Sequence, residues 1–289
     1  MRVHLTSGAG NDFLALIEPD ADPPAERVRA WCRRGLSLGA DGLFVLRRRG
    51  GGGGTAAVEM THYNADGTHA ELCVNGTRCA ARLAFALGWA TGEVEVGTGA
   101  GPIAARDAGA GRVALALAAP GAVEEFEVVV GNGPGAETVG GTTVVRGWRV
   151  AVGVPHFVVP WRRSLAEAPL AGLGPPLRGH PAFGEAGTNV DWVRWLGGGR
   201  IEVRSWERGV GAETLACGSG VLAAAAAGLA AGEVELPVVA LTAGGAELEV
   251  ADAGGGRWEL TGEARLLGVV EVNEAAAAAG PAGPARWTG

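Results

Sequence analysis

The sequence predicts an α/β protein of the α+β type, with two pseudo-symmetric domains that each wrap a mostly antiparallel or mixed sheet around a central helix. Many short β-branched runs indicate the sheets. The stretch Ser219–Ala231 is apolar on every side, and a helix without a polar face is buried all round. Two segments, AELCVNGTRCAARLA and AETLACGSGVLAAAA, repeat one order of residue types: an acidic residue, a cysteine, a glycine-bearing turn and an alanine-rich helix.

The elements follow from local patterns. An amphipathic helix is predicted at Pro23–Arg34 and ends at Gly35. A solvated hairpin loop is predicted at Arg47–Gly54 (RRRGGGGG). Asn75–Leu87 carries a broad apolar stripe, and the Ala/Gly/Pro-rich stretch Glu274–Gly289 is typical of a frayed end. Strands are expected at Leu43–Arg47, Gly92–Val96, Arg112–Leu117, Val123–Val130, Thr142–Val152, Asn189–Trp195, Arg200–Ser205, Val234–Leu241, Ala246–Val250 and Arg257–Leu260.

Composition excludes several functions. The chain has 24 basic and 31 acidic residues, a net charge of −7, which argues against a nucleic-acid partner. All of the basic residues are arginine, so no lysine can hold pyridoxal phosphate as a Schiff base. The most apolar stretch, Val221–Ala231, is too short for a bilayer, which takes about 20 residues. We therefore expect no nucleic-acid or membrane partner.

The cysteines and histidines do not predict a metal site. The four cysteines form no CxxC pair and the five histidines are scattered. No signal peptide is visible in MRVHLTSGAGNDF, so we expect a cytoplasmic protein with free thiols, and with neither metal nor cofactor.

Two cysteines, Cys73 and Cys217, stand immediately before the two apolar helices. A helix N-terminus carries partial positive charge, which favours thiolate, and its free N–H groups bind anions such as carboxylates. If the domains face each other across a cleft, a small carboxylate could lie between two helix ends with one thiol on each side. The N–H donors would come from Val74, Asn75 and Gly76 on one side and from Gly218, Ser219 and Gly220 on the other.

This arrangement suits inversion of a stereocentre next to a carboxylate. One thiolate removes the α-proton from one face, and one thiol returns a proton to the other. Without pyridoxal, the helix-end dipoles must stabilise the developing carbanion. Cys32 and Cys79 lie on apolar helical stripes and are read as core residues.

Six segments match the signatures of one known family, in the same order: Gly8–Phe13, Gly39–Leu43, Asn64–Arg78, Pro155–His156, Gly187–Val190 and Glu207–Ala224. Over most of its length the chain thereby resembles the diaminopimelate epimerase family. The resemblance implies a pyridoxal-independent epimerase of LL- and meso-diaminopimelate in lysine and peptidoglycan synthesis, usually a homodimer. It also implies that the last strand returns to the first domain. With a hinge expected near Ala118–Gly121 (AAPG), this gives domains of residues 1–118 plus about 266–289, and of residues 119–265.

The resemblance also assigns roles to single residues. Cys73 and Cys217 match the acid/base thiols, and His156 and Glu207 match residues that support catalysis. An Arg–Glu pair suits an amino acid, because arginine can bind its carboxylate and glutamate its ammonium group. The positions matching substrate-contacting residues are Asn11, Asn64, Val74, Asn75, Asn189, Glu207, Arg208, Gly218 and Ser219.

Three residues depart from the family pattern. Val74 replaces a glycine after the first cysteine, Val154 replaces an asparagine before Pro-His, and Ala212 is an additional residue before Cys217. They bear on the identity of the substrate more than on the type of reaction.

Other interpretations stay open. The nearest is a related cofactor-independent racemase of another amino acid. A cysteine hydrolase would use Cys217 as nucleophile and His156 as base, and a non-catalytic anion-binding module would need neither thiol. Taken alone, Asn11 and Asn64 could be turn formers and Glu207–Arg208 a surface pair.

Overall fold

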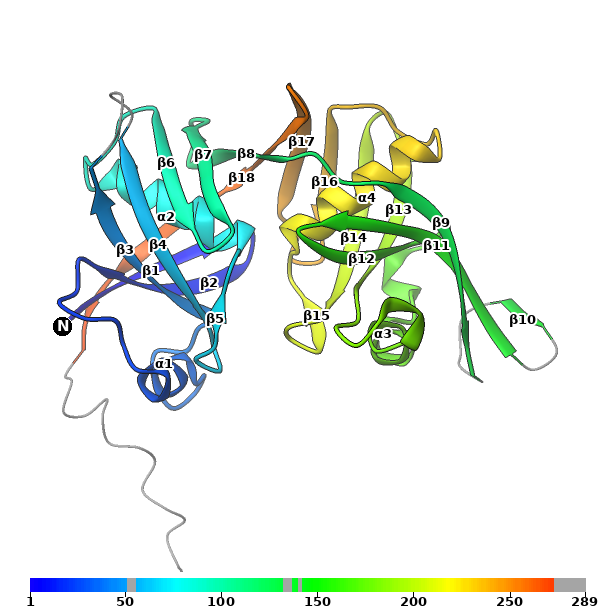
Figure 1. Ribbon diagram of the computed structural model, residues 1–289, viewed down its shortest axis with the longest axis horizontal. Helices are drawn as coiled ribbons and strands as arrows, with labels where there is room; N and C mark the ends of the chain where they lie inside the picture. The colour runs from blue at the N-terminus through cyan, green and yellow to red at the C-terminus, as the bar shows by residue number, and fades with distance from the viewer. Residues whose placement is uncertain (51–55, 132–136, 140–141, 273–289) are drawn as a thin grey trace, which may run out of the picture. The chain divides into compact units, whose positions relative to one another are not determined.

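The computed structural model describes residues 1–50, 56–131, 137–139 and 142–272 (Figure 1). Residues 51–54 of the expected hairpin loop Arg47–Gly54, and the expected frayed end Glu274–Gly289, lie outside the described residues. The chain divides into two compact units, unit 1 with residues 1–107 and 264–289, and unit 2 with residues 108–263.

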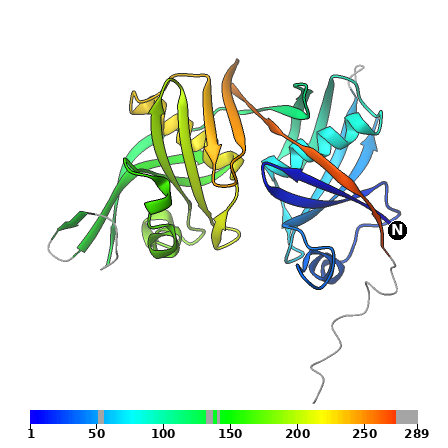
Figure 2. The same ribbon diagram turned by 180° about the vertical axis from the view of Figure 1, so that it is seen from behind.

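Unit 1 is a mixed sheet with α2 packed against its strands. The strand order is β19-β1-β2-β3-β4-β6-β7, and only the pairs β2–β3 and β4–β6 are parallel. Figure 2 shows β19, from the end of the chain, beside the N-terminal β1. The elements are β1 (Arg2–Gly8), β2 (Asn11–Ile17), α1 (Ala25–Cys32), β3 (Gly42–Arg49), β4 (Ala57–Asn64), β5 (His69–Ala70), α2 (Val74–Ala86), β6 (Glu93–Thr98), β7 (Gly101–Asp107) and β19 (Arg265–Glu271).

Unit 2 is built in the same way around α4. The strand order is β8-β18-β17-β16-β14-β13-β12-β11-β9, and only β12–β13 and β14–β16 are parallel. The elements are β8 (Arg112–Ala118), β9 (Val123–Val130), β10 (Glu137–Val139), β11 (Thr142–Val152), β12 (Val154–Pro160), the 3-10 turns Leu165–Glu167 and Pro181–Phe183, α3 (Leu170–Arg178), β13 (Asn189–Gly197), β14 (Arg200–Glu207), β15 (Ala212–Thr214), α4 (Gly218–Ala230), β16 (Val238–Thr242), β17 (Glu247–Gly254) and β18 (Arg257–Glu263).

The two units repeat one topology, which confirms the predicted fold class. The strands β1-β2-β3-β4-β6-β7 and β11-β12-β13-β14-β16-β17 have the same sequence of antiparallel and parallel pairs. Helices α2 and α4 occupy the same place in each series, after the short strands β5 and β15. Each cysteine before a helix therefore follows a short strand that pairs with the longer strand before it.

Some element bounds differ from the sequence-based expectations. The division between the units falls before β8 and not at residue 118, because β8 pairs along its length with β18. Helix α3 was not expected, since Pro175 and Pro176 lie inside it. It forms because Leu170, Leu173 and Leu177 are all buried against the sheet of unit 2.

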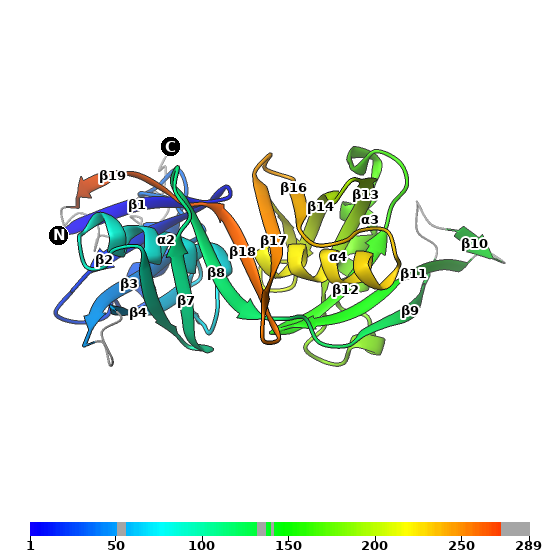
Figure 3. The same cartoon turned by 90° about the horizontal axis from the view of Figure 1, so that it is seen from above.

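Helix α4 is buried along most of its length, as its composition predicts. Alanine and glycine occupy nine of its thirteen positions, and Val221 to Ala225 are fully buried. Figure 3 shows α4 running along the strands of unit 2 and α2 along those of unit 1. At Gly228 a side-chain carbon would lie 2.7 Å from Trp195 Nε1 and from Val234 Cγ2. The helix therefore needs small residues where the sheet comes close.

We predict that Gly228→Ala destabilises the protein although alanine favours helices. The added methyl group has no room, and overpacking of this kind costs about 1–3 kcal/mol, against a gain of about 1 kcal/mol in helix propensity. Urea unfolding measures the effect. The matched control is Gly172→Ala on the exposed side of α3, which we expect to be neutral or stabilising. A Gly228→Ala protein as stable as the wild type would contradict the close packing.

Candidate active site

Cys73 caps the N-terminus of α2. Its backbone is extended, with φ −131° and ψ 103°, and its Sγ accepts a hydrogen bond from the Gly76 amide at 3.4 Å. Thr77 adds a second link, because its amide and its hydroxyl both donate to the Cys73 carbonyl, at 2.8 and 2.9 Å. The thiol is half-buried and sits at the positive end of the helix.

A chain of side-chain hydrogen bonds leads from α2 to β2. Buried Arg78 donates to Asn75 Oδ1 at 2.6 Å, and Asn75 Nδ2 donates to Asn11 Oδ1 at 2.5 Å. Asn11 Nδ2 in turn donates to Asp41 Oδ2 at 3.0 Å. Arginine donates only, so its contact with Oδ1 sets the orientation of the Asn75 amide. Asp41 and Arg78 thus hold the two amides that the sequence singles out.

Two further residues of β4 lie in unit 1. Asn64 is exposed and donates to the Thr68 hydroxyl at 3.0 Å, within its own turn. His62 is buried beside Gly76, and burial lowers the pKa of its imidazole to about 4. His62 is therefore neutral near pH 7.

Cys217 caps α4 in the same manner. Its backbone is extended, with φ −114° and ψ 109°, and Sγ accepts from the Gly220 amide at 3.4 Å. The Ser219 hydroxyl lies 3.4 Å from the same sulfur atom. The side chain is only 7% exposed, so this thiol is more deeply enclosed than Cys73.

Glu207 lies against this thiol. Its Oε1 accepts a hydrogen bond from Thr214 Oγ1 at 2.5 Å, and its carboxylate is close enough to Cys217 for the two groups to shift each other's pKa. Burial, followed by the negative charges of Glu207 and Asp191, raises the pKa of the Cys217 thiol well above its ordinary value. The expectation that the helix end favours thiolate is therefore wrong for Cys217, because burial and two carboxylates outweigh the helix end.

A buried polar network joins the start of β12 to the end of β14. His156 Nδ1 lies 2.7 Å from Asp191 Oδ2, and the Ser205 hydroxyl donates to Asp191 Oδ1 at 2.6 Å. On the other side of the imidazole, Asn189 Nδ2 lies 3.4 Å from His156 Nε2. The Arg208 amide donates to Asn189 Oδ1 at 2.7 Å. All of these side chains except that of Arg208 are at most 5% exposed.

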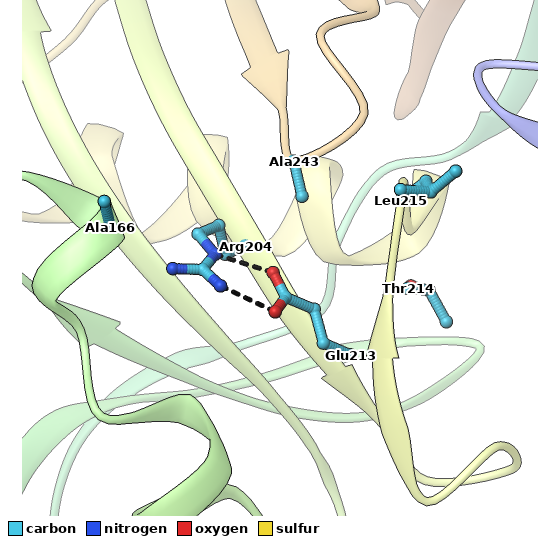
Figure 4. A pocket seen from close by; sticks show the side chains of 6 residues that line it. All are labelled: Ala166, Arg204, Glu213, Thr214, Leu215 and Ala243. Carbon is cyan, nitrogen blue, oxygen red and sulfur yellow. Dashed lines mark hydrogen bonds and ion pairs between the residues drawn. The ribbon is translucent and has the colours of Figure 1, made fainter.

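The segment between Glu207 and Cys217 is anchored by an ion pair that lines an open pocket of about 560 Å³ (Figure 4). Arg204 donates two hydrogen bonds of 2.6 Å to Glu213 and one of 2.5 Å to the Leu165 carbonyl. Glu213 is in β15 next to Thr214, so the pair holds the strand that brings Thr214 to Glu207. The pocket is lined by Ala166, Arg204, Glu213, Thr214, Leu215 and Ala243.

The three departures from the family pattern have definite places. Ala212 pairs with Glu207 across β14 and β15, so the additional residue is taken up in a strand. Val74 is buried in the first turn of α2. Val154 is half-buried as the first residue of β12, opposite Val152.

The structure groups the expected site residues within each unit. Unit 1 brings Asn11 and Asn75 together at the helix that Cys73 caps, with Val74 in its first turn, whereas Asn64 bonds within its own turn. Unit 2 groups His156, Asn189, Glu207, Arg208, Cys217, Gly218 and Ser219.

Sequence reasoning missed the residues that hold this group in place. Asp191 and Ser205 in unit 2, and Asp41 and Arg78 in unit 1, were not singled out. One signal was available, since the acidic Asp191 stands between the apolar residues Val190 and Trp192 of an expected strand. A charged residue in such a strand is rarely buried without a partner.

Solved structures with this fold include several isomerases. A hydroxyproline epimerase of Agrobacterium vitis has a TM-score of 0.64 and 18% identity, covering 93% of this chain and 91% of that one. A phenazine biosynthesis protein of Bacillus anthracis has a TM-score of 0.66 and 14% identity, covering 94% and 99%. At these identities the likeness establishes the fold alone.

Sequence comparison identifies the family. The family described as diaminopimelate epimerase matches residues 3–133 and 149–267. Diaminopimelate epimerases of Aquifex aeolicus and Moorella thermoacetica are each 36% identical to this chain, covering 84% of it and 87% and 88% of their own lengths. The chain belongs to the diaminopimelate epimerase family, whose members are isomerases.

No helix in the described part of the chain is long and apolar enough to cross a membrane.

We predict that Glu207→Gln lowers the pKa of the Cys217 thiol. The carboxylate disfavours a second negative charge beside it, and the neutral amide removes that repulsion. The pH dependence of iodoacetamide labelling, followed by peptide mass mapping, measures the shift. Glu202→Gln in the same strand is the control, since Glu202 pairs with Arg194. Equal or slower labelling of Cys217 in Glu207→Gln at every pH would contradict the prediction.

Proposed function

We propose that this protein interconverts LL- and meso-diaminopimelate by a two-thiol acid–base mechanism. The observation that carries the proposal is the pair of cysteines that cap two helices at equivalent places in the repeated topology. Each sulfur atom accepts a hydrogen bond from the third residue of its helix, so each is held at a cluster of N–H groups. Membership of the diaminopimelate epimerase family supports the choice of substrate.

The two thiols would act on opposite faces of one carbon. One sulfur takes the α-proton as a thiolate, the electron pair moves toward the carboxylate, and the other sulfur delivers a proton from a thiol. The first sulfur is then the thiol and the second the thiolate, so the roles exchange in each turnover. The helix ends would stabilise the charge that develops on the carboxylate.

The thiols would begin from unequal states. Burial and the charge of Glu207 favour the protonated form of Cys217, whereas Cys73 is half-buried. We therefore propose Cys217 as the resting acid and Cys73 as the resting base.

Binding would use the polar groups around each cysteine. Arg208 would bind a carboxylate of the substrate and Glu207 an ammonium group, while His156 and Glu207 support the Cys217 thiol. The backbone amides of Gly218 and Ser219, and of Val74 and Asn75, would bind the carboxylate at the reacting centre. The side-chain amides of Asn11, Asn64 and Asn189 would be further hydrogen-bonding groups for the substrate.

A cofactor-independent racemase of another amino acid is the second candidate. Val154 favours it, because valine cannot hydrogen-bond to a polar substrate end. Its thiol chemistry would be the same, so an activity panel of diaminopimelate and simpler amino acids separates the two. A protein inert on diaminopimelate but active on another amino acid would replace the first candidate.

We also propose a cellular location and an oligomeric state for the enzyme. The thiol mechanism needs no cofactor, and none of the four cysteines, all within the described residues, forms a disulfide, which suits a reducing cytoplasm. We propose a homodimer, and the exposed apolar side chains of Leu266, Leu267 and Val269 on β19 are candidates for its contact.

Replacing either capping cysteine should abolish epimerisation. We expect Cys73→Ser and Cys217→Ser each to lower kcat on LL-diaminopimelate by about 10²- to 10⁴-fold, the contribution usual for an acid or base group. The matched controls are Cys32→Ser and Cys79→Ser, because both thiols are buried and burial raises the pKa of Cys32 to about 12. Either capping variant working at near wild-type rate would contradict the two-thiol mechanism.

A further inference from the structure

We propose that Asp191 is a positioning residue that keeps His156 in one neutral tautomer and, through Asn189, fixes the backbone of Arg208. The inference rests on the proposed function, since it explains how the Glu207–Arg208 pair is presented to the substrate. Asp191 is not among the residues to which the family resemblance assigns a role.

The backbone amide of Arg208 determines which atoms of this network donate and which accept. A backbone N–H can only donate, so the Arg208 amide requires Asn189 Oδ1 as its acceptor. The amide nitrogen of Asn189 must then face His156 Nε2, which has to accept the hydrogen bond. A nitrogen that accepts carries no proton, so the single ring proton of His156 is on Nδ1 and is donated to Asp191.

Asp191 is the ionised end of this chain. Both of its oxygens accept, one from His156 Nδ1 and one from the Ser205 hydroxyl. The carboxylate also lies under the first turn of α4, so close that any side chain on Gly220 would collide with it. The positive end of the helix thus helps to stabilise a fully buried anion.

Protonation of His156 on both nitrogens would break the chain. Nε2–H and Asn189 Nδ2 would then be two donors facing each other, and the Asn189 amide would have to turn over. Its nitrogen would then face the Arg208 amide, which is again two donors. The tautomer set by Asp191 is therefore coupled to the backbone position of Arg208.

The repeated topology shows that the fold does not need this network. Equivalent positions in the two units can be aligned from the two capping cysteines. The residue three positions before the cysteine is Thr214 in β15, which pairs with Ser205, and Ala70 in β5, which pairs with His62. The same registers place Phe44 where Asp191 stands and Phe13 where His156 stands. Unit 1 thus builds the same strands with two phenylalanines in contact, 6.3 Å between ring centres.

This comparison favours a role in the reaction. A buried charged network is weak evidence for stability, because apolar residues of similar volume are often as good or better. At these positions unit 1 has two apolar side chains and unit 2 has a hydrogen-bonded pair. The network of unit 2 ends on the residues beside Cys217.

The direct test is the tautomer itself. Two-bond ¹H–¹⁵N spectra of protein labelled with ¹⁵N-histidine at pH 8 distinguish the two nitrogens, and His156→Gln assigns the signal. We expect a protonated Nδ1 and an unprotonated Nε2 in the wild type. An imidazolium, or a proton on Nε2, would overturn the proposal.

Variants test the consequence for the reaction. Asp191→Leu removes the acceptor, and we expect His156 to lose the single tautomer and kcat/KM to fall about 10- to 100-fold. Ser205→Ala leaves the carboxylate in place and should keep the tautomer. Thr6→Val, which also removes one buried hydrogen bond, is the control for stability and activity. Asp191→Leu with an unchanged tautomer and kcat/KM within twofold of the wild type would contradict the positioning role.

The outcomes separate this inference from the proposed function. A wild type with the expected tautomer and no activity on diaminopimelate would overturn the function and leave the network standing. A wild type that is active on diaminopimelate but has another His156 tautomer would overturn the network and leave the proposed function standing. If Asp191→Leu does not fold, the wild-type and Ser205→Ala spectra still decide the tautomer.

Discussion

The interaction on which the site depends is the hydrogen bond from a helix backbone amide to a cysteine sulfur. At both Cys73 and Cys217 the sulfur takes the place that a serine or aspartate oxygen occupies in an ordinary N-cap. The cap places each cysteine sulfur beside the backbone N–H groups of the first helical turn. Gly76 and Gly220 donate these amides, and the missing side chain at Gly220 makes room for Asp191 below the helix start. In the proposed mechanism, this one local structure, which occurs twice, supplies both the acid–base group and the donors that bind the carboxylate.

The two copies share a backbone but differ in electrostatics. In unit 1 the strands below the helix start carry Phe13, Phe44 and a neutral His62. In unit 2 the same places hold a buried carboxylate and its partners, and Glu207 lies beside the sulfur. A thiol surrounded by carboxylates is a better acid at rest than a base, because a second negative charge is disfavoured there. In the proposed mechanism this difference makes Cys217 the resting acid.

The sequence predicted the parts of the fold that local pattern encodes. Cysteine, glycine turn and apolar helix repeat within short segments, so the two helix starts could be placed to within one residue. Strand β12 and helix α3 could not be predicted, because each contains two prolines, which disfavour strands and helices. The prolines are at 155 and 160 in β12 and at 175 and 176 in α3, and α3 is stabilised by its burial.

The polar networks were equally hidden from the sequence. His156 and Asp191 are 35 residues apart and meet only because β12 and β13 pair in parallel. The raised pKa of Cys217 likewise depends on depth of burial, which no spacing of residues reports.

In the proposed mechanism, two sulfurs handle two different protons on one carbon. Incubation of the wild-type enzyme with LL-diaminopimelate in D₂O tests it most directly, with mass spectrometry of both isomers at early conversion. We predict deuterium at the inverted carbon of the product from the first turnovers, while unreacted substrate keeps its proton, because the proton that leaves and the one that arrives use separate groups. A first product that retains the proton of the substrate would show that a single base carries it across, and would contradict the account.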